Sequence, residues 1–354
     1  MMPELGVIEG YFGRAWSWED RAEVINRLAP MGYAFFHYAP KIDSHLRRNW
    51  RNIHDEAETK NLRRFIEHCA SHRVKSGIGL SPYGAHINFD RTTKDALKAK
   101  IAYLNMIGID DLVILFDDMR GDYADLAKRQ AEIIDFAIGC SKASRFFMCP
   151  SYYSDDPLLD RVFGQRPEAY LETLGKLLDP AISVYWTGEE VCSREFGVGH
   201  LVSVAELLGR KPSIWDNYPV NDGPRMSNHL HLRAFTGRPA AMGSHIAHHA
   251  INPASQPILS CVPALTLPLC YRRGEAYSYA AAFAEAATTV CGTDFAFLLQ
   301  EDLNLLEDRG LSGIADRLAE VRQKYASVDH PAAREIVDWL SGGYAITGEM
   351  LRTQ

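Results

Sequence analysis

The sequence lacks the features of a membrane protein, a secreted disulfide-rich protein or a nucleic-acid-binding protein. No stretch approaches ~18 uninterrupted apolar residues, so no membrane-spanning helix is expected. The first residues lack a basic segment followed by an apolar run, so no signal peptide is expected either. Lysine and arginine together number 38 against 45 aspartates and glutamates, which leaves a net charge of −7. This balance argues against nucleic acid as the main partner and gives no reason to expect membrane binding.

Cysteine pairs and two common catalytic signatures are also missing. The seven cysteines are scattered, and none of them forms a C-x-x-C pair. An odd number without such spacing predicts a reducing compartment, and we therefore expect a cytoplasmic protein without a disulfide framework. No glycine-rich phosphate loop follows the first apolar run, and no G-x-S-x-G nucleophile elbow is apparent.

What the chain does contain is a regular alternation of short apolar runs with segments of helical periodicity. Eight β-then-α units of this kind predict an α/β fold in which residues 1–272 form a closed (β/α)8 TIM barrel. A doubly wound open sheet is the alternative. The eight candidate strands cover residues 5–9, 33–39, 75–80, 112–116, 146–149, 182–186, 213–215 and, least clearly, 241–246.

Several helices carry recognisable boundary signals. Ser17 and Asp20 have the spacing of a capping box, and Thr93 precedes an amphipathic stretch, 94–107, that ends at Gly108. From about residue 274 only helical periodicity remains, without strands between the helices. We therefore expect residues 273–354 to form a helical C-terminal region packed on the barrel, where it covers apolar surface and carries no separate activity.

Two adjacent carboxylates, Asp117 and Asp118, follow the apolar run at 112–116. A five-residue apolar run indicates a strand buried on both faces, so the pair is expected at the rim of a hydrophobic core. Close like charges cannot both ionise freely there. One pKa is therefore expected to rise, which suits a general acid, while the neighbouring group stays anionic. The same dipeptide is also common in solvated turns and helix caps.

The other predicted strand ends carry aromatic, amide and carboxylate side chains, among them Trp186, Trp215, Asn217 and Asp222. Catalytic groups of such barrels collect at the carboxyl ends of the strands. Aromatic faces stack on the C–H face of a pyranose, and Asp and Asn bond to its hydroxyls, so these residue types favour a sugar site. The tryptophans could equally form layers of the barrel core.

A group of histidines offers a different interpretation. His245, His248 and His249 could ligate a metal in a metal-dependent barrel hydrolase, although the first predicted strand lacks the histidine pair expected of such enzymes. Two further alternatives are a carbohydrate-binding pseudoenzyme and a partner-binding scaffold built on the C-terminal helices.

Taken together, the strand-end segments resemble the ordered motifs of glycoside hydrolase family 84, the β-N-acetylglucosaminidases that include protein O-GlcNAcases and bacterial enzymes labelled hyaluronidases. The segments are EGYFGRAWS at 9–17, YAPK at 38–41, FDD at 116–118, CP at 149–150, WTG at 186–188, WDN at 215–217 and ND at 221–222. The resemblance runs from about residue 5 to about residue 255. It implies a retaining exo-hydrolase of terminal β-linked GlcNAc, without metal or other cofactor.

The resemblance also implies a mechanism and a set of site residues. The substrate's own 2-acetamido oxygen would attack the anomeric carbon and give an oxazoline intermediate. Asp117 would orient the acetamido N–H, and Asp118 would act as general acid and then as general base. Expected partners are a GlcNAc-containing glycan or glycoprotein, with no nucleic acid and no membrane, and the oligomeric state is not readable. Sugar-binding roles are implied for Gly10, Lys41, Tyr153, Thr187, Trp215, Asn217, Asp222 and Asn252.

Overall fold

The chain folds around a closed barrel of parallel strands. The computed structural model describes residues 2–354, and within them eight strands follow one another around the barrel in sequence order. β1 pairs with β2 on one side and with β8 on the other, which closes the sheet. This architecture confirms the predicted (β/α)8 barrel. The strands are β1 (Glu4–Glu9), β2 (Tyr33–Tyr38), β3 (Lys75–Leu80), β4 (Asp111–Leu115), β5 (Arg145–Cys149), β6 (Ser183–Trp186), β7 (Ser213–Asp216) and β8 (His248–Ile251).

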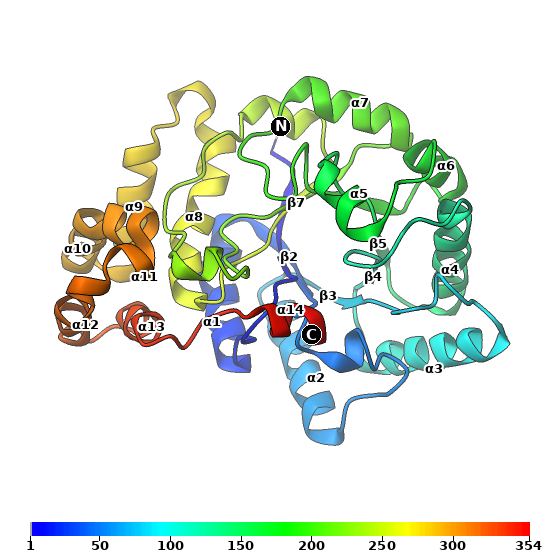
Figure 1. Cartoon of the computed structure of the whole chain (residues 1–354), viewed down its shortest axis with the longest axis horizontal. Helices are drawn as coiled ribbons and strands as arrows, with labels where there is room; N and C mark the ends of the chain where they lie inside the picture. Colours follow the sequence, from blue (N-terminus) through cyan, green and yellow to red (C-terminus); the bar gives the residue numbers. More distant parts are fainter. Residues whose placement is uncertain (1) are drawn as a thin grey trace.

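Helices surround the barrel on its outer face (Figure 1). Because a right-handed crossover returns the chain to the same end of the sheet, every strand exit faces the same side of the molecule. The helices between and after the strands are α1 (Trp18–Leu28), α2 (Glu56–Ser71), α3 (Arg91–Ile107), α4 (Leu126–Cys140), α5 (Pro157–Phe163), α6 (Tyr170–Leu177), α7 (Val198–Leu208) and α8 (Pro257–Arg273).

The strands are buried on both faces, because helices cover the outside and side chains fill the inside. β4 is typical, since all five of its residues are buried. At the amino ends of the strands, some of the side chains that fill the inside of the barrel are polar. The carboxylate of Asp111 accepts hydrogen bonds of 2.8 and 2.6 Å from Arg145 and lies 2.9 Å from Nε2 of His37. Both of its oxygens therefore have partners inside the barrel.

Capping residues set the helix boundaries, and two of the three predicted boundaries are found in the structure. Ser17 caps α1, and the reciprocal hydrogen bonds with Asp20 complete the predicted capping box. Gly108, with a φ of 90°, ends α3 as expected. The start of α3 differs from the prediction, because Asp90 is the cap and accepts a hydrogen bond from the Thr93 N–H at 2.9 Å. Aspartate accepts this bond as readily as threonine, so the helix begins one turn earlier.

The predicted strand at 241–246 is wrong. Ala240–Ser244 form a short 3-10 helix, η4, and β8 begins only at His248. Two consecutive histidines hide this strand from a search for apolar runs. His249 is nevertheless fully buried, because its ring nitrogens lie 2.9 Å from Asp216 and 2.7 Å from the Tyr271 hydroxyl. Partners on other elements make this burial possible, and periodicity does not reveal them.

Six more α-helices follow the barrel within residues 2–354. Figure 1 shows α9 to α13 on one side of the molecule beside α8, whereas α14 lies across the barrel. Glu335 of α13 anchors this group, because its carboxylate accepts bonds of 2.8 and 2.9 Å from the Ile258 and Leu259 N–H groups at the start of α8. The division of the chain into two domains near residue 272 stays a prediction. The helices are α9 (Tyr279–Cys291), α10 (Thr293–Leu303), α11 (Gly310–Gly313), α12 (Leu318–Ala326), α13 (Pro331–Leu340) and α14 (Gly348–Thr353).

The described helices were also compared with the requirements of a membrane span. None of those in residues 2–354 combines the length and the apolar character needed to cross a bilayer.

Candidate active site

A cavity of about 380 Å³ opens at the carboxyl ends of the barrel strands. This volume lies in the range of small-molecule binding sites. All ten residues that the sequence analysis assigned to a sugar site line it, although they come from seven different strand exits. They are Gly10, Lys41, Asp117, Asp118, Tyr153, Thr187, Trp215, Asn217, Asp222 and Asn252.

The backbone after β4 brings both aspartates to this cavity. Adjacent residues on a regular strand point to opposite faces of the sheet, so a continuing strand would separate their side chains. β4 ends at Leu115, and Asp118 adopts a φ of 57° in the left-handed region. This conformation is sparsely populated by residues other than glycine and is found preferentially where function requires it. The turn directs two consecutive carboxylates into one cavity.

Asp117 is buried, and only one of its carboxylate oxygens is satisfied. The Lys41 ammonium donates a hydrogen bond to Oδ2. Oδ1 is buried and has no hydrogen-bond partner within residues 2–354. An unsatisfied buried acceptor is costly, and such groups in native proteins usually have a specific reason. Asp117 thus lines the cavity with a carboxylate that keeps one unsatisfied oxygen.

Asp118 is more accessible, with 23% of its side chain exposed. Its Oδ1 accepts a hydrogen bond from the Tyr153 hydroxyl at 3.3 Å, and its Oδ2 lies 3.3 Å from Nζ of Lys41. Burial alone would raise the pKa of Asp118, but the charges of Lys41 and Arg47 and the hydrogen bonds hold it below its usual range. The expected rise in pKa is not found for this residue, because a cation lies beside the pair.

Lys41 is the buried cation that joins the two carboxylates. Only 3% of its side chain is exposed, and its Nζ contacts both Asp117 and Asp118. Burial alone would lower the pKa of Lys41, but the two carboxylates raise it above its ordinary value. The ammonium also lies 6.0 Å from the centre of the Trp215 ring and 5.7 Å from that of Phe12. The lysine stays charged, and it compensates one of the two negative charges.

A rigid wall forms where β1, β7 and β8 end. The Trp215 indole N–H donates to Oδ1 of Asn217 at 2.9 Å, and the same oxygen accepts a bond of 3.0 Å from Nδ2 of Asn252. Asn252 in turn accepts a bond of 3.2 Å from the Gly10 N–H. A Cβ atom at Gly10 would approach the Trp215 ring to 2.2 Å, so only glycine fits. This network fixes the position of the indole, which lines the cavity.

Thr187 and Asp222 contribute in different ways. The Thr187 hydroxyl donates to the Glu190 carbonyl at 3.1 Å, so its polar atom is already engaged within the protein. Asp222 accepts a bond of 3.0 Å from the Phe12 N–H. Burial, together with the nearby charge of Asp118, raises the pKa of Asp222 to about 6. Asp222, and not Asp118, is thus the carboxyl group of the cavity with a raised pKa.

Comparison with known proteins decides the family. A family profile described as beta-N-acetylglucosaminidase matches residues 5–302. The chain belongs to this family. The match confirms the predicted resemblance to glycoside hydrolase family 84 and the predicted enzyme class, the glycoside hydrolases.

Individual relatives give the same picture. The protein O-GlcNAcase of Mus musculus is 29% identical over 277 residues, which cover 75% of this chain and 30% of the mouse protein. The Rattus norvegicus protein O-GlcNAcase matches with the same identity and coverage. The chain therefore spans about a third of the length of these relatives. A solved structure of a mutant Thermobaculum terrenum O-GlcNAc hydrolase has a TM-score of 0.80 at 24% identity, covers 96% of this chain and 81% of that chain, and supports the fold.

Some lining residues of this β-N-acetylglucosaminidase family member were not predicted. Phe12 and Cys149 lie within the motifs that carry the resemblance, so a signal for them was present in the sequence. Leu351 of α14 also lines the cavity. It lies far beyond the barrel in the sequence, and no local pattern connects it with the strand exits. The other unpredicted lining residues are Leu158, Val191, Cys192, Val220, Gly223 and Met226.

The alternative metal site at His245, His248 and His249 is not formed. Successive residues of a strand face opposite sides, so His248 and His249 diverge. His248 lies 2.9 Å from the Ser213 hydroxyl, whereas His249 bonds to Asp216. His245 lies outside β8, at the end of η4. The three side chains do not form a cluster of possible metal ligands among the residues that the structure describes.

Proposed function

We propose that this chain is a retaining exo-β-N-acetylglucosaminidase that uses the 2-acetamido group of its substrate as the nucleophile. The observation that carries the proposal is Oδ1 of Asp117, a buried acceptor without a hydrogen-bond partner in residues 2–354. Such an acceptor calls for a donor from the ligand, and the acetamido N–H of GlcNAc is such a donor. Glucose, which has a hydroxyl at this position, offers no acyl oxygen to attack the anomeric carbon.

In the first step, the acetamido oxygen bonds to the anomeric carbon while the glycosidic bond breaks. Asp117 accepts the N–H hydrogen bond and stabilises the positive charge that spreads over the forming oxazoline ring. Asp118 gives its proton to the departing oxygen. In the second step Asp118 takes a proton from water, which attacks the anomeric carbon and reopens the ring. Two inversions at this carbon give net retention.

The acid role requires that a bound sugar change the protonation of Asp118. In the free protein Lys41 holds the pKa of Asp118 below its usual range. A sugar that covers the exposed part of this side chain removes water from it, and a hydroxyl that engages the Lys41 ammonium weakens the ion pair. Both changes favour the protonated acid. Substrate binding then prepares the general acid as well as the nucleophile.

Features of the cavity and of the relatives bear on the leaving group. The relatives are named as protein O-GlcNAcases, and we propose GlcNAc linked to serine or threonine of a protein as the substrate class. Part of the cavity lining is apolar, which can pack against apolar side chains of a polypeptide next to the modified residue. Free cysteines at all seven positions agree with a reducing, cytoplasmic location. The apolar lining residues are Leu158, Val191, Met226 and Leu351.

The test is hydrolysis of an aryl β-N-acetylglucosaminide beside the matching aryl β-glucoside. We expect kcat/KM to favour the N-acetyl substrate by at least about 10³-fold, because only this substrate carries the internal nucleophile. Asp117→Asn should remove most of this advantage, and Asp122→Asn, at an exposed carboxylate paired with Arg120, serves as the matched control. Equal turnover of the two glycosides would refute the mechanism. Tight binding of GlcNAc without turnover of either would favour the carbohydrate-binding alternative.

A further inference from the structure

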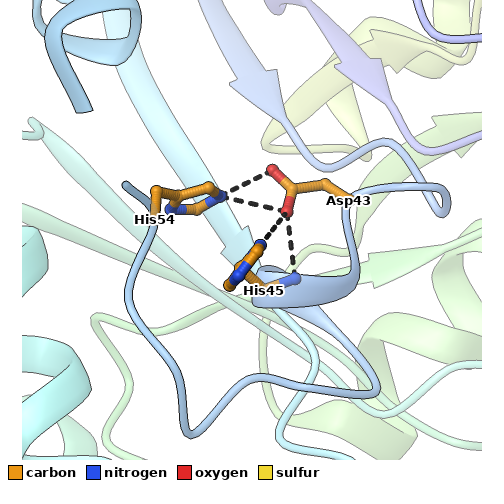
Figure 2. Close-up of side chains that lie close together, drawn as sticks. All are labelled: Asp43, His45 and His54. Carbon is orange, nitrogen blue, oxygen red and sulfur yellow. Dashed lines mark hydrogen bonds and ion pairs between the residues drawn. The ribbon is translucent and has the colours of Figure 1, made fainter. Parts of the chain in front are cut away.

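A second group of ligand-type side chains lies between β2 and α2. Asp43, His45 and His54 bring one carboxylate and two imidazoles together (Figure 2), and one possible ligand atom from each lies within 4.8 Å of the others. Among the described residues, none of the three lines the active-site cavity. We propose that this cluster binds a divalent transition-metal ion of the zinc class, in a structural role that is separate from the glycosidase reaction.

The geometry is close to that of a zinc site with three protein ligands. Zinc bonds of ~2.0–2.2 Å in tetrahedral geometry place neighbouring ligand atoms roughly 3.3 Å apart. Nε2 of His54 lies 3.0 and 2.9 Å from the two carboxylate oxygens of Asp43. Nδ1 of His45 lies 4.0 Å from Oδ1 of Asp43. Because the His45 side chain is 40% exposed, it can close the remaining gap without disturbing the core. Water can then occupy the fourth position.

The two buried ligands already have the supporting contacts that metal ligands usually have. Nδ1 of His54 lies 3.2 Å from the Tyr103 hydroxyl, which is 2.9 Å from Oγ1 of Thr59. The Tyr38 hydroxyl donates a bond of 3.0 Å to Oδ2 of Asp43. Hydrogen bonds of this kind orient the imidazole and the carboxylate and fix which nitrogen faces the metal.

The protons of His54 and Tyr103 can rearrange so that a bond from His54 to the metal ion replaces its hydrogen bond to Asp43. In the tautomer that carries its proton on Nε2, His54 donates to Asp43, and Nδ1 accepts from the Tyr103 hydroxyl. With metal, Nε2 must be unprotonated, so its proton passes through solvent to Nδ1, which then donates to the Tyr103 oxygen. Tyr103 can turn its own hydrogen toward Thr59. A neutral histidine therefore binds the ion without leaving a buried group unpaired.

The position of His45 separates this cluster from a simple buried hydrogen-bonded pair. The His54–Asp43 pair would also suit a purely structural hydrogen bond, but that role does not need His45. The His45 ring makes no hydrogen bond within the part of the chain that the structure describes, yet it faces the Asp43 carboxylate (Figure 2).

The experiment is a titration of the chelator-treated, buffer-exchanged full chain with zinc chloride, followed by calorimetry and by thermal unfolding. We expect saturation at one ion per chain. A hundredfold excess of free zinc over Kd should raise Tm by roughly 3–5 °C. His45→Ala should weaken the affinity at least tenfold and abolish most of the Tm shift. Tyr103→Phe keeps all three ligands and should weaken binding by about 10–100-fold, because it removes only the support of His54.

His72→Ala is the matched control. His72 and His68 form another partly exposed histidine pair, with ring centres 4.5 Å apart, but no carboxylate of residues 2–354 completes it as a cluster of three. Its replacement should leave the zinc affinity unchanged. The proposal is overturned if the wild-type chain shows no saturable binding, or if His45→Ala and Tyr103→Phe both bind zinc as tightly as the wild type. Loss of affinity in His72→Ala alone would place the ion at the other pair.

Discussion

Two buried aspartates at opposite ends of the same strand make an informative comparison. Asp111 begins β4 at the amino end of the barrel, and both of its oxygens are bonded by Arg145 and His37. Asp117 follows the carboxyl end of β4, where Lys41 engages one oxygen and the other has no partner in residues 2–354. Each carboxylate is buried and close to a cation. Only the second retains an open acceptor for a ligand.

The two carboxylates show that one end of the barrel serves stability, whereas the other end serves ligand binding. A fully bonded carboxylate repays part of its desolvation cost inside the protein and holds the strands together. A carboxylate with one unbonded oxygen keeps part of its desolvation cost until a ligand binds. In this respect an active site differs from the core of the protein. Substitutions at the two ends should therefore show their effects in different measurements.

The largest effect is expected at the carboxyl end, in activity. Asp118→Asn should lower kcat/KM for glycosides with poor leaving groups by about 10²–10⁴-fold, because the general acid is lost. Aryl glycosides with good leaving groups need less protonation and should lose much less. A series of substrates with graded leaving-group pKa measures the difference. Uniform loss across the series would exclude Asp118 as the acid.

At the amino end the expected effect is on stability. Asp111→Ala leaves the buried His37 without its carboxylate partner, whereas Arg145 keeps Glu4 at 2.6 Å, and should lower the free energy of unfolding by about 1–3 kcal/mol. Chemical denaturation measures this loss, and KM of the remaining folded enzyme should change little. Asp117→Ala should cost less stability, since Asp118 still pairs with Lys41 at 3.3 Å. The comparison fails if Asp117→Ala destabilises the chain as much as Asp111→Ala does.

A smaller effect is expected where packing shapes the cavity wall. Gly10→Ala would bring a methyl group to 2.2 Å from the Trp215 ring, so the indole must move. Overpacking of this kind usually costs about 1–3 kcal/mol. We expect a higher KM and a lower kcat, with a shift in tryptophan fluorescence that reports the moved ring. Gly139→Ala, in α4 with open space around it, should leave both kinetic constants unchanged.

The smallest effect is a pH dependence of sugar binding. Asp222 has a pKa of about 6, so it is mostly protonated at pH 5 and ionised at pH 7. The ionised group is the stronger acceptor for sugar hydroxyls, so the affinity for free N-acetylglucosamine should rise by up to about tenfold between pH 5 and pH 7. Calorimetry at several pH values measures this. Asp222→Asn should flatten the profile, and a profile that keeps its slope in that variant would assign the titration to another group.

The same raised pKa has the opposite consequence for folding. Because the folded state disfavours the Asp222 carboxylate, this group contributes stability at low pH and loses that contribution as pH rises from its unfolded value through about 6. Improved binding and reduced stability should therefore appear over the same pH range. This combination is expected of a group retained for a ligand.

Much of the fold and of the candidate site was accessible from the sequence. Short apolar runs that are followed by polar residues predicted the barrel. At the carboxyl ends of the barrel strands, every proposed site residue lines one cavity. The eighth strand was predicted at the wrong position, because His248 and His249 break the apolar pattern and form hydrogen bonds with side chains of another strand. One pKa of the aspartate pair was expected to rise, but that of Asp118 is lowered, because Lys41 comes from a different strand exit and lies beside it. Charges that meet only in the folded chain decide the electrostatics of the site.

By itself the sequence determined the barrel and the order of its polar strand ends, because apolar periodicity and turn chemistry act between residues that are close along the chain. It also placed two carboxylates at the end of β4. Tertiary structure alone decided that Lys41 lies beside them, that Asp222 carries the raised pKa, and that Leu351 reaches the cavity. The physical reason is that burial and electrostatic interactions depend on distances in space, which only the closed barrel and its C-terminal helices establish.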